Sequence, residues 1–103
     1  MTGPEQKRRL RGVVLKLIYE NHEAQKHRLD DTTLTGVLRR LQYDVYGNLI
    51  REILQDLRDR GLVSFEGQRD KMTGSRTIRM IQITPAGRDI IEKTSTNPAV
   101  EVE

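Results

Sequence analysis

Residues 44–63 read DVYGNLIREILQDLRDRGLV, and this stretch decides the fold. Its apolar residues recur every three or four positions, which is the spacing of a helix with one buried face. These residues are Leu49, Ile50, Ile53, Leu54 and Leu57. Asp44 is the expected N-cap, because a short carboxylate can accept hydrogen bonds from the first free N–H groups of a helix. Gly61 is expected to adopt the left-handed conformation that closes a helix at its C-terminus.

A second apolar stripe lies just before this stretch and predicts a short helix. The stripe consists of Leu34, Val37, Leu38 and Leu41. It follows the polar group 30–33, whose short oxygen-bearing side chains suit a helix start. Gln42 and Tyr43 alone separate the stripe from Asp44, and so short a connection makes the two helices packed neighbours. The sequence therefore predicts a helix-turn-helix.

A further amphipathic helix is expected near the N-terminus, over residues 5–21. Its apolar stripe consists of Leu10, Val13, Val14, Leu17 and Ile18. Pro4 suits the first position of this helix, because it lacks an N–H group that would find no partner there. The longest apolar run in this region, 13–15, is broken by Lys16, so the sequence predicts neither a signal peptide nor a membrane span. We expect a cytoplasmic protein.

After the helix-turn-helix the pattern changes to that of β-strands. Residues 62–66 and 77–83 are β-branched or apolar runs, and they predict the two strands of a hairpin. The polar segment 67–76 joins them as a long basic tip. The alternation of the second run slips around Met80 and Ile81, so the sequence does not decide which of its faces is buried along its whole length.

The C-terminal part is expected to hold one short helix and a tail. Thr84 is the expected N-cap of the helix and Pro85 its first residue. The side chains available for packing are Ala86, Ile90 and Ile91. Residues 95–103 have the composition of a frayed, flexible tail. A chain of 103 residues is the length of one domain, which we place at residues 1–94.

The composition argues against an enzyme. The chain has no cysteine, which excludes a disulfide scaffold, a thiolate zinc site and a cysteine nucleophile. His22 and His27 are five residues apart in a polar segment and do not share one helical face for a metal ion. The carboxylates are dispersed, and no phosphate-binding glycine motif occurs. We therefore expect no catalytic residues, no cofactor and no metal.

The net charge of +3 is concentrated in two basic blocks. Residues 1–16 and residues 67–88 each carry five basic residues and one acidic residue. Residues 17–66 and 89–103 each carry a negative net charge. Blocks of positive charge are typical of proteins that bind a phosphate backbone, and they also keep exposed segments soluble.

Two motifs in this order resemble the winged helix-turn-helix regulators of the bacterial PadR and MarR kinds. Residues 57–63 (LRDRGLV) match the end of the recognition helix in these families. Residues 83–88 (ITPAGR) resemble the segment that follows the second wing strand, with Ile83 in place of a leucine. The similarity covers roughly residues 8–92. It implies an α+β fold with three helices, a two-stranded β-hairpin wing and a C-terminal helix.

The resemblance also implies which side chains would touch double-stranded DNA. The start of the third helix would enter the major groove, where side chains with paired donors and acceptors read base edges. If Ile50, Leu54 and Leu57 face the core, the opposite side of that helix carries Tyr46, Asn48, Arg51 and Gln55. In the wing, the side chains that could reach phosphates or the neighbouring minor groove are Arg69, Lys71, Arg76 and Arg79.

Two functions stay open at this point. One is sequence-specific binding of double-stranded DNA by a transcription regulator; a palindromic target would then require a homodimer, with the first or the last helix as its interface. The other is a protein–protein interaction module that holds its partner through the third helix or the hairpin edge. The third helix is nearly neutral, since Glu52, Asp56 and Asp59 offset its arginines, and this is also the composition of a solvated helix face. We expect the first function and keep the second as its alternative.

Overall fold

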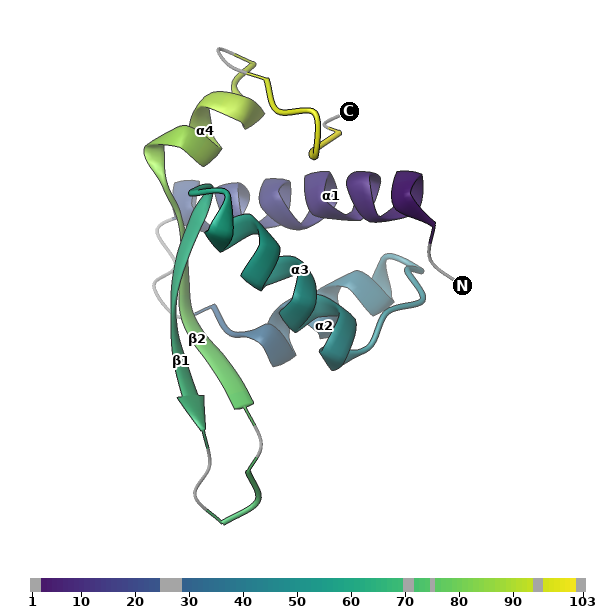
Figure 1. Ribbon diagram of the computed structural model, residues 1–103, viewed down its shortest axis with the longest axis vertical. Coiled ribbons are helices and arrows are strands. Elements are labelled where there is room, and N and C mark those ends of the chain that lie inside the picture. Colours follow the sequence, from purple (N-terminus) through teal and green to yellow (C-terminus); the bar gives the residue numbers. More distant parts are fainter. Residues whose placement is uncertain (1–2, 25–28, 70–71, 75, 94–95, 102–103) are drawn as a thin grey trace.

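The computed structural model describes residues 3–24, 29–69, 72–74, 76–93 and 96–101. Among these residues, four helices and one antiparallel sheet of two strands are present. The elements are α1 (Pro4–Glu23), α2 (Asp31–Arg40), α3 (Gly47–Asp59), β1 (Val63–Arg69), β2 (Arg76–Ile83) and α4 (Pro85–Ile91). The expected α+β class and the expected order of elements are confirmed (Figure 1), and the arrangement is compatible with a winged helix.

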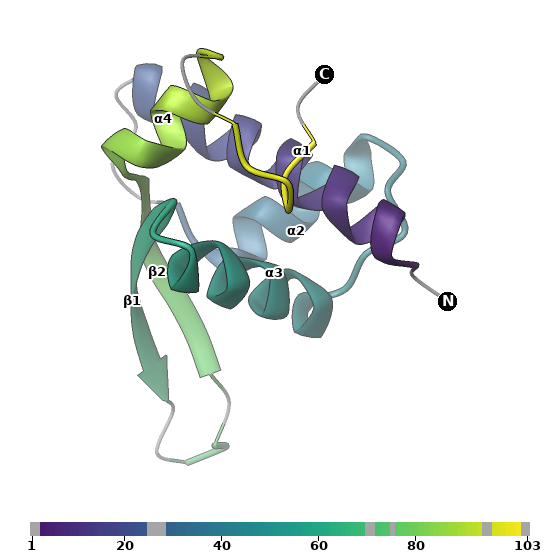
Figure 2. The same ribbon diagram turned by 45° about the horizontal axis from the view of Figure 1, so that its top comes forward.

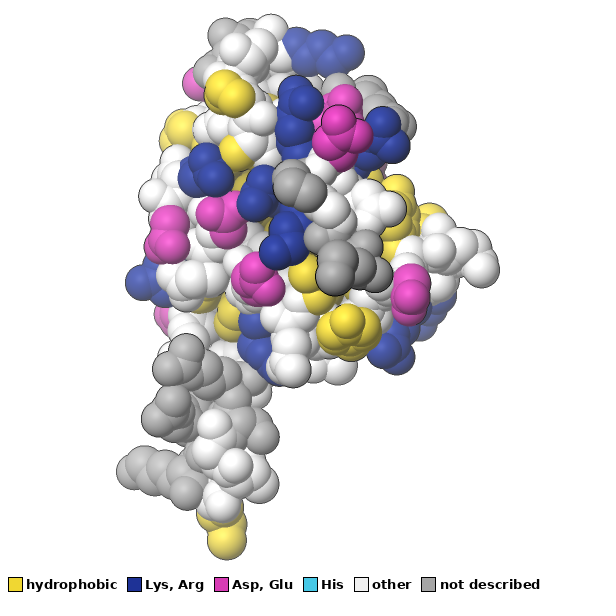
Figure 3. Space-filling model, turned by 45° about the vertical axis from the view of Figure 1, so that its right-hand side comes forward, with side chains coloured by type: hydrophobic (Ala, Val, Ile, Leu, Met, Phe, Trp, Pro, Cys, Tyr) yellow, Lys and Arg dark blue, Asp and Glu magenta, His cyan; other side chains and the backbone are white. Residues whose placement is uncertain are grey.

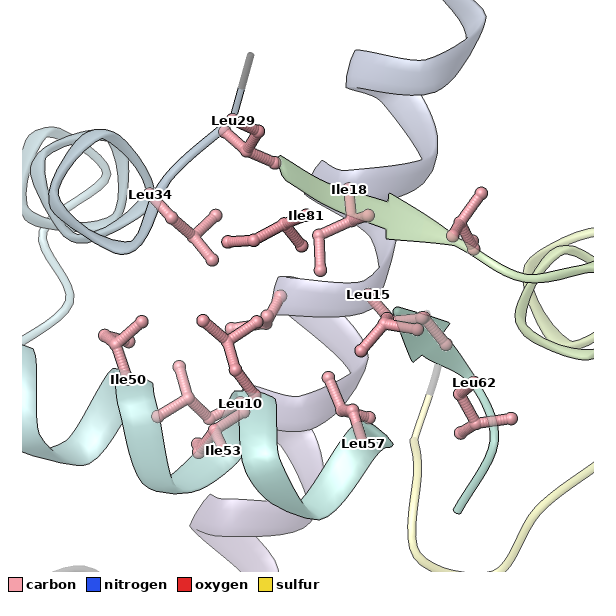
Figure 4. Packing of buried hydrophobic residues seen from close by; sticks show 14 of the residues in the cluster. Leu10, Leu15, Ile18, Leu29, Leu34, Ile50, Ile53, Leu57, Leu62 and Ile81 are labelled. Carbon is pink, nitrogen blue, oxygen red and sulfur yellow. The ribbon is translucent and has the colours of Figure 1, made fainter. Parts of the chain in front are cut away.

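The hydrophobic core lies where α1, α2, α3 and the base of the hairpin meet. Figure 4 shows Leu15 of α1, Leu34 of α2 and Ile50 of α3 pointing into one cluster, with Ile81 of β2 beside them. Leu15 and Ile50 are completely buried. The apolar stripes of separate helices therefore share one interior, as expected for a single small core.

In α1, the buried face differs from the predicted stripe by a small rotation. Leu10, Val14 and Ile18 are buried as expected, but Leu15 joins them. Val13 and Leu17, which the spacing also placed in the core, are partly exposed at its edge. The packing of β2 and α4 against α1 decides this rotation, because the spacing alone fits both positions.

The expected N-cap of α3 is wrong. Asp44 lies before the helix, which begins at Gly47 with Tyr46 in the N-cap position. The cause is Val45, which is buried in the core with 3% of its surface exposed, so the chain must stay extended there before it turns into the helix. Arg39 stabilises this path, because its Nε donates a hydrogen bond to the Val45 carbonyl oxygen at 2.8 Å.

The hairpin contains a β-bulge at the position where the sequence pattern slips. Ser64 pairs with Gln82 and Glu66 with Arg79, so β2 has one residue more than β1 between these pairs. Met80 adopts a positive φ of 55° at this point. A bulge of this kind shifts the alternation of side chains, so residues 78 and 81 both face the core.

The junction between α3 and α4 follows the predicted caps. Gly61 has a φ of 75°, the left-handed conformation expected after α3. Thr84 caps α4, since its Oγ1 accepts a hydrogen bond from the Gly87 N–H at 3.2 Å. The same hydroxyl donates to the Gly61 carbonyl oxygen at 2.7 Å. One side chain thus joins the end of one helix to the start of another.

The C-terminal segment 96–101 differs from the expected frayed tail. It runs beside α1 in both ribbon views (Figures 1 and 2), and Val100 is buried with 5% of its surface exposed. Glu101 donates its N–H to the Arg8 carbonyl oxygen and pairs through its carboxylate with Arg9 at 3.0 Å. One valine in a polar stretch is too weak a signal to predict this contact, which depends on the basic first half of α1.

Among the described residues, no helix is long and apolar enough to cross a membrane.

Candidate nucleic-acid interface

Helix α3 separates an apolar face from a polar one. Its buried residues are Ile50, Ile53, Leu54 and Leu57, and none of them exposes more than 3% of its surface. The opposite side exposes Asn48, Glu52, Gln55 and Asp59. Tyr46, Asn48 and Gln55 face outward as predicted, because the apolar residues at helical spacing have turned the helix in the expected direction, whereas Arg51 is only partly exposed.

Three of the four predicted residues on α3 gather around its first turn. Tyr46 is the N-cap and exposes 59% of its surface. Asn48 follows in the first turn, and Arg51 reaches back toward it. Gln55 lies one turn further on, where its amide donates a hydrogen bond to Asp59 Oδ1 at 3.1 Å. The start of α3 thus brings an aromatic ring, an amide and a guanidinium group together.

The guanidinium group of Arg51 is held by its own chain. It donates to Asn48 Oδ1 and forms an ion pair with Asp31 Oδ2 at 3.4 Å. It also lies against Gly47, where a Cβ atom would be 3.2 Å from Arg51 Nη1. About a third of the Arg51 side chain, 34%, is exposed. The side chain is therefore oriented along the start of α3 while part of its donor surface faces solvent.

Asp31 is the residue that sequence reasoning missed. The polar group at residues 30–33 predicts capping residues, and Asp30 does cap α2 by accepting the Thr33 N–H at 2.7 Å. Asp31 is instead the first residue of α2 and is buried, with 3% of its surface exposed. The adjacent pair of aspartates carried a signal, since one residue alone can be the N-cap and the other must find a different partner.

A hollow of about 360 Å³ lies between the starts of α2 and α3. Asp31, Thr32, Thr35 and Arg39 line it from α2, and Gly47 and Arg51 line it from α3. Two helix N-termini, two guanidinium groups and two hydroxyl groups favour an anion, whereas the Asp31 carboxylate opposes one. With these groups around it, the hollow suits a phosphate at the rim near Arg39 better than a phosphate deep inside beside the Asp31 carboxylate.

In the hairpin, Arg79 is exposed on β2. Arg69 and Arg76 face each other in the strand register at the outer end of the hairpin. Their side chains and the whole of Lys71 lie outside the described residues, so the structure does not place these three predicted contacts. Met72, in the described part of the tip, exposes 95% of its surface.

Part of the basic block at the start of α1 is used inside the protein. Lys7 pairs with Glu52 of α3 at 3.1 Å, and Arg11 pairs with Asp56 of α3 at 2.5 Å. Asp56 also pairs with Arg60. Figure 3 accordingly shows Lys and Arg side chains interspersed with Asp and Glu over the body of the protein. The acidic residues of α3 are thus neutralised largely by α1, and the helix presents a polar face of low net charge.

A metal centre has no support in the described part of the chain. No group of three or more His, Asp or Glu residues there could hold a metal ion. His22 is exposed at the end of α1, and His27 lies outside the described residues.

Comparison with known proteins identifies no relative. No family model matches the sequence, and no curated protein matches it. Any assignment of function therefore depends on the sequence and the geometry given above.

Proposed function

We propose that this chain is a winged-helix protein that binds double-stranded DNA sequence-specifically and regulates transcription. In this proposal α3 enters the major groove, and the hairpin contacts the phosphate backbone. The observation that carries the proposal is the exposed first turn of α3. There Tyr46, Asn48 and Arg51 place an aromatic ring, an amide and a guanidinium group together on a helix whose other face is buried.

The dimensions of α3 support this role. It has 13 residues, which at the usual rise of 1.5 Å per residue is about 20 Å of helix. The major groove, roughly 12 Å wide, admits one α-helix. Asn48 and Gln55 can each form paired hydrogen bonds with adenine, and Arg51 can form them with guanine. Glu52, which would repel phosphates, already has a cationic partner in Lys7.

The position of the hairpin supports the second contact. In both ribbon views the hairpin starts beside the C-terminal end of α3 and extends away from α1 (Figures 1 and 2). A helix in the major groove and a basic arm beside it would then reach the same duplex. In the sequence, the segment 67–76 between the strands carries three basic residues, Arg69, Lys71 and Arg76, against one acidic residue, Asp70.

A different class of function is favoured by the low net charge of α3. Glu52 and Asp59 are exposed on the same face as Gln55, and a helix face of this composition also suits a protein partner. In that case the basic hairpin would serve solubility alone.

Binding to a labelled duplex of random sequence tests the proposal. Fluorescence anisotropy at low and at physiological salt should show binding that weakens steeply as salt rises, because each phosphate contact releases counterions. A target sequence would then be selected from a random library. If the folded protein does not bind at low salt, DNA binding is excluded, and the protein–protein function takes its place.

Substitution of Arg51 tests the reading face once a target sequence is known. Arg51→Ala should reduce the preference for that sequence by roughly 1–3 kcal/mol, because a bidentate contact to one base pair is lost. Lys71→Ala should instead weaken binding to all sequences alike and reduce the salt dependence. Arg8→Ala, an exposed change in α1, is the control and should leave sequence preference unchanged. An Arg51→Ala protein with full sequence preference would show that another face reads the DNA.

A further inference from the structure

Asp31 is the one buried charged residue in the part of the chain that the structure describes. Only 4% of its side chain is exposed. It is the first residue of α2, so the partial positive charge at the start of that helix favours its carboxylate. A buried carboxylate is still costly without a partner of opposite charge. The charged partner of Asp31 is Arg51 of α3, whose Nη1 lies 3.4 Å from Asp31 Oδ2.

Three residues orient the guanidinium group of Arg51. Its Nη1 donates to the Asp31 carboxylate, and its Nη2 donates to Asn48 Oδ1. The third residue is Gly47, where an added Cβ atom would be 3.2 Å from Nη1 and 3.7 Å from Cζ. Because glycine has no side chain, this space is left for the guanidinium group. Contacts from both α2 and α3 thus fix the position of Arg51 before any ligand binds.

These contacts leave part of the guanidinium group for a ligand. A guanidinium carries five N–H donors, and the hydrogen bonds to Asp31 and Asn48 engage two of them. With 34% of the Arg51 side chain exposed, donors remain within reach of a ligand. A side chain that is already held loses less conformational entropy on binding than a mobile one. Arg51 is therefore preorganised to donate hydrogen bonds from the start of α3.

The charge of Asp31 affects which part of DNA suits Arg51. A phosphate beside Arg51 would also lie close to the Asp31 carboxylate, and like charges repel. The edge of a base carries no net charge, so it can accept hydrogen bonds from the guanidinium group without this repulsion. The ion pair between Asp31 and Arg51 therefore favours a base edge over the phosphate backbone.

The contact with Asn48 affects which base is favoured. A guanidinium has donors only, so the Asn48 atom that it contacts is the amide oxygen. Paired hydrogen bonds to adenine need that oxygen as an acceptor. Since the oxygen already accepts from Arg51, Asn48 offers chiefly its N–H groups, and the start of α3 presents mainly donors. In the major groove guanine presents two acceptors, N7 and O6, which suit such a surface.

We propose that Asp31 is a positioning residue that presents Arg51 to guanine, and that the DNA target of α3 contains a guanine opposite the start of this helix. The inference rests on the proposed function, because it names the base that the same face reads. Asp31 would not touch the DNA itself, since its side chain is buried. It acts through Arg51.

Selection from a library of duplexes with a random central segment tests the base. The wild-type protein should select one position at which guanine is preferred at least about fivefold over each other base. Arg51→Ala should abolish this preference, and Asp31→Asn should remove most of it, while the other positions stay unchanged. A selected site without such a guanine, or an Asp31→Asn protein that keeps the full preference, overturns the proposal.

Asp30→Asn is the matched control for this selection. It makes the same chemical change on the neighbouring aspartate, which accepts the Thr33 N–H instead of pairing with Arg51. Asparagine caps a helix as well as aspartate does, so α2 should keep its stability. The Asp30→Asn protein should select the same guanine as the wild type. Equal losses of preference in Asp30→Asn and Asp31→Asn would overturn a specific role of Asp31.

Affinity for a random duplex separates positioning from a general loss of structure. Asp31→Asn removes a negative charge, so the variant should bind a random duplex at least as tightly as the wild type. A variant with a damaged fold would bind every duplex more weakly. In the Arg51→Ala background, Asp31→Asn should cause no further loss of guanine preference, because the two residues act as a unit. A further loss in that background would show that Asp31 does not act through Arg51.

NMR of the guanidinium groups tests the positioning without DNA. In a mobile arginine, rotation about the Cζ–Nε bond averages the signals of the Nη groups, whereas a held guanidinium gives separate signals. At low temperature Arg51 should give separate signals in the wild type and averaged signals in Asp31→Asn. Arg8, whose side chain is exposed on α1, is the internal reference and should be averaged in both. Averaged Arg51 signals in the wild type overturn the positioning role.

The two proposals fail in different ways. A protein that selects a DNA sequence independently of Asp31 would overturn the positioning role and leave the proposed function standing. A folded protein that binds no DNA at low salt would overturn the proposed function and the guanine preference with it. Separate Arg51 signals would then still show that the side chain is held in the free protein.

Discussion

Leu57→Ala is expected to lower the free energy of unfolding by about 2–5 kcal/mol. Leu57 lies in the last turns of α3 and is completely buried. Figure 4 shows it among the side chains that α1, α3 and the start of β1 direct into the core. The substitution removes apolar surface from a dry interior and leaves a cavity, which the backbones of α3 and α1 cannot both move to fill.

Urea denaturation followed by circular dichroism measures this loss. Leu41→Ala is the matched control, because it removes the same atoms from a leucine that exposes 53% of its surface. It should cost less than about 1 kcal/mol when both variants are compared at a concentration where the chain is monomeric. Equal effects of the two substitutions would mean that α3 is rotated about its axis relative to the structure described above, and the reading face would move with it.

Helical spacing predicted the elements because each helix of this small protein has one buried side. The stripe from Ile50 to Leu57 faces the core, with Leu49 partly buried at its edge, so the outward direction of Asn48 and Gln55 followed from it. The residue at which α3 begins could not be predicted from this spacing. Asp44 is the better cap by its chemistry, but burial of Val45 delays the helix, and that burial depends on residues distant in the sequence.

The sequence predicted which residues belong to the candidate site, but it did not predict which contacts these residues make with one another and with the rest of the chain. Tyr46 and Asn48 are exposed as expected, whereas Arg51 is partly engaged by Asp31, twenty positions earlier on another helix. Ion pairs of this kind have no signature in spacing, since they depend on how helices cross. For the same reason the pairing of Lys7 with Glu52 could not be foreseen from the basic block of α1.

The bulge in the hairpin and the C-terminal segment differ in how well the sequence predicts them. The slip at Met80 was visible in the sequence, and the structure resolves it as an extra residue in β2. Val100 gave no comparable signal, because a single valine among polar residues fits a frayed tail as well as a docked one. A pattern predicts an element when several residues share one face, and it fails when one residue makes the contact.

Gly87→Ala is expected to lower the free energy of unfolding by about 3 kcal/mol, near the upper end of the usual cost of overpacking. Gly87 lies within α4, and its backbone is packed against Leu62, which directly precedes β1. A Cβ atom there would be 2.2 Å from the Leu62 carbonyl oxygen and 2.8 Å from Ile83 Cγ1. The Leu62 oxygen cannot withdraw freely, since it accepts a hydrogen bond from the Thr84 N–H at 3.1 Å.

Gly36→Ala is the matched control and should have the opposite sign. Gly36 lies in the middle of α2, and a Cβ atom there would meet nothing within 4 Å. Alanine is favoured over glycine inside a helix by roughly 0.5–1 kcal/mol, so this variant should unfold at higher urea concentration than the wild type. If Gly87→Ala also unfolds at a higher urea concentration than the wild type, α4 does not approach Leu62 closely. In that case Thr84 does not hold α3 and α4 in the arrangement described above, in which α3 presents its polar face.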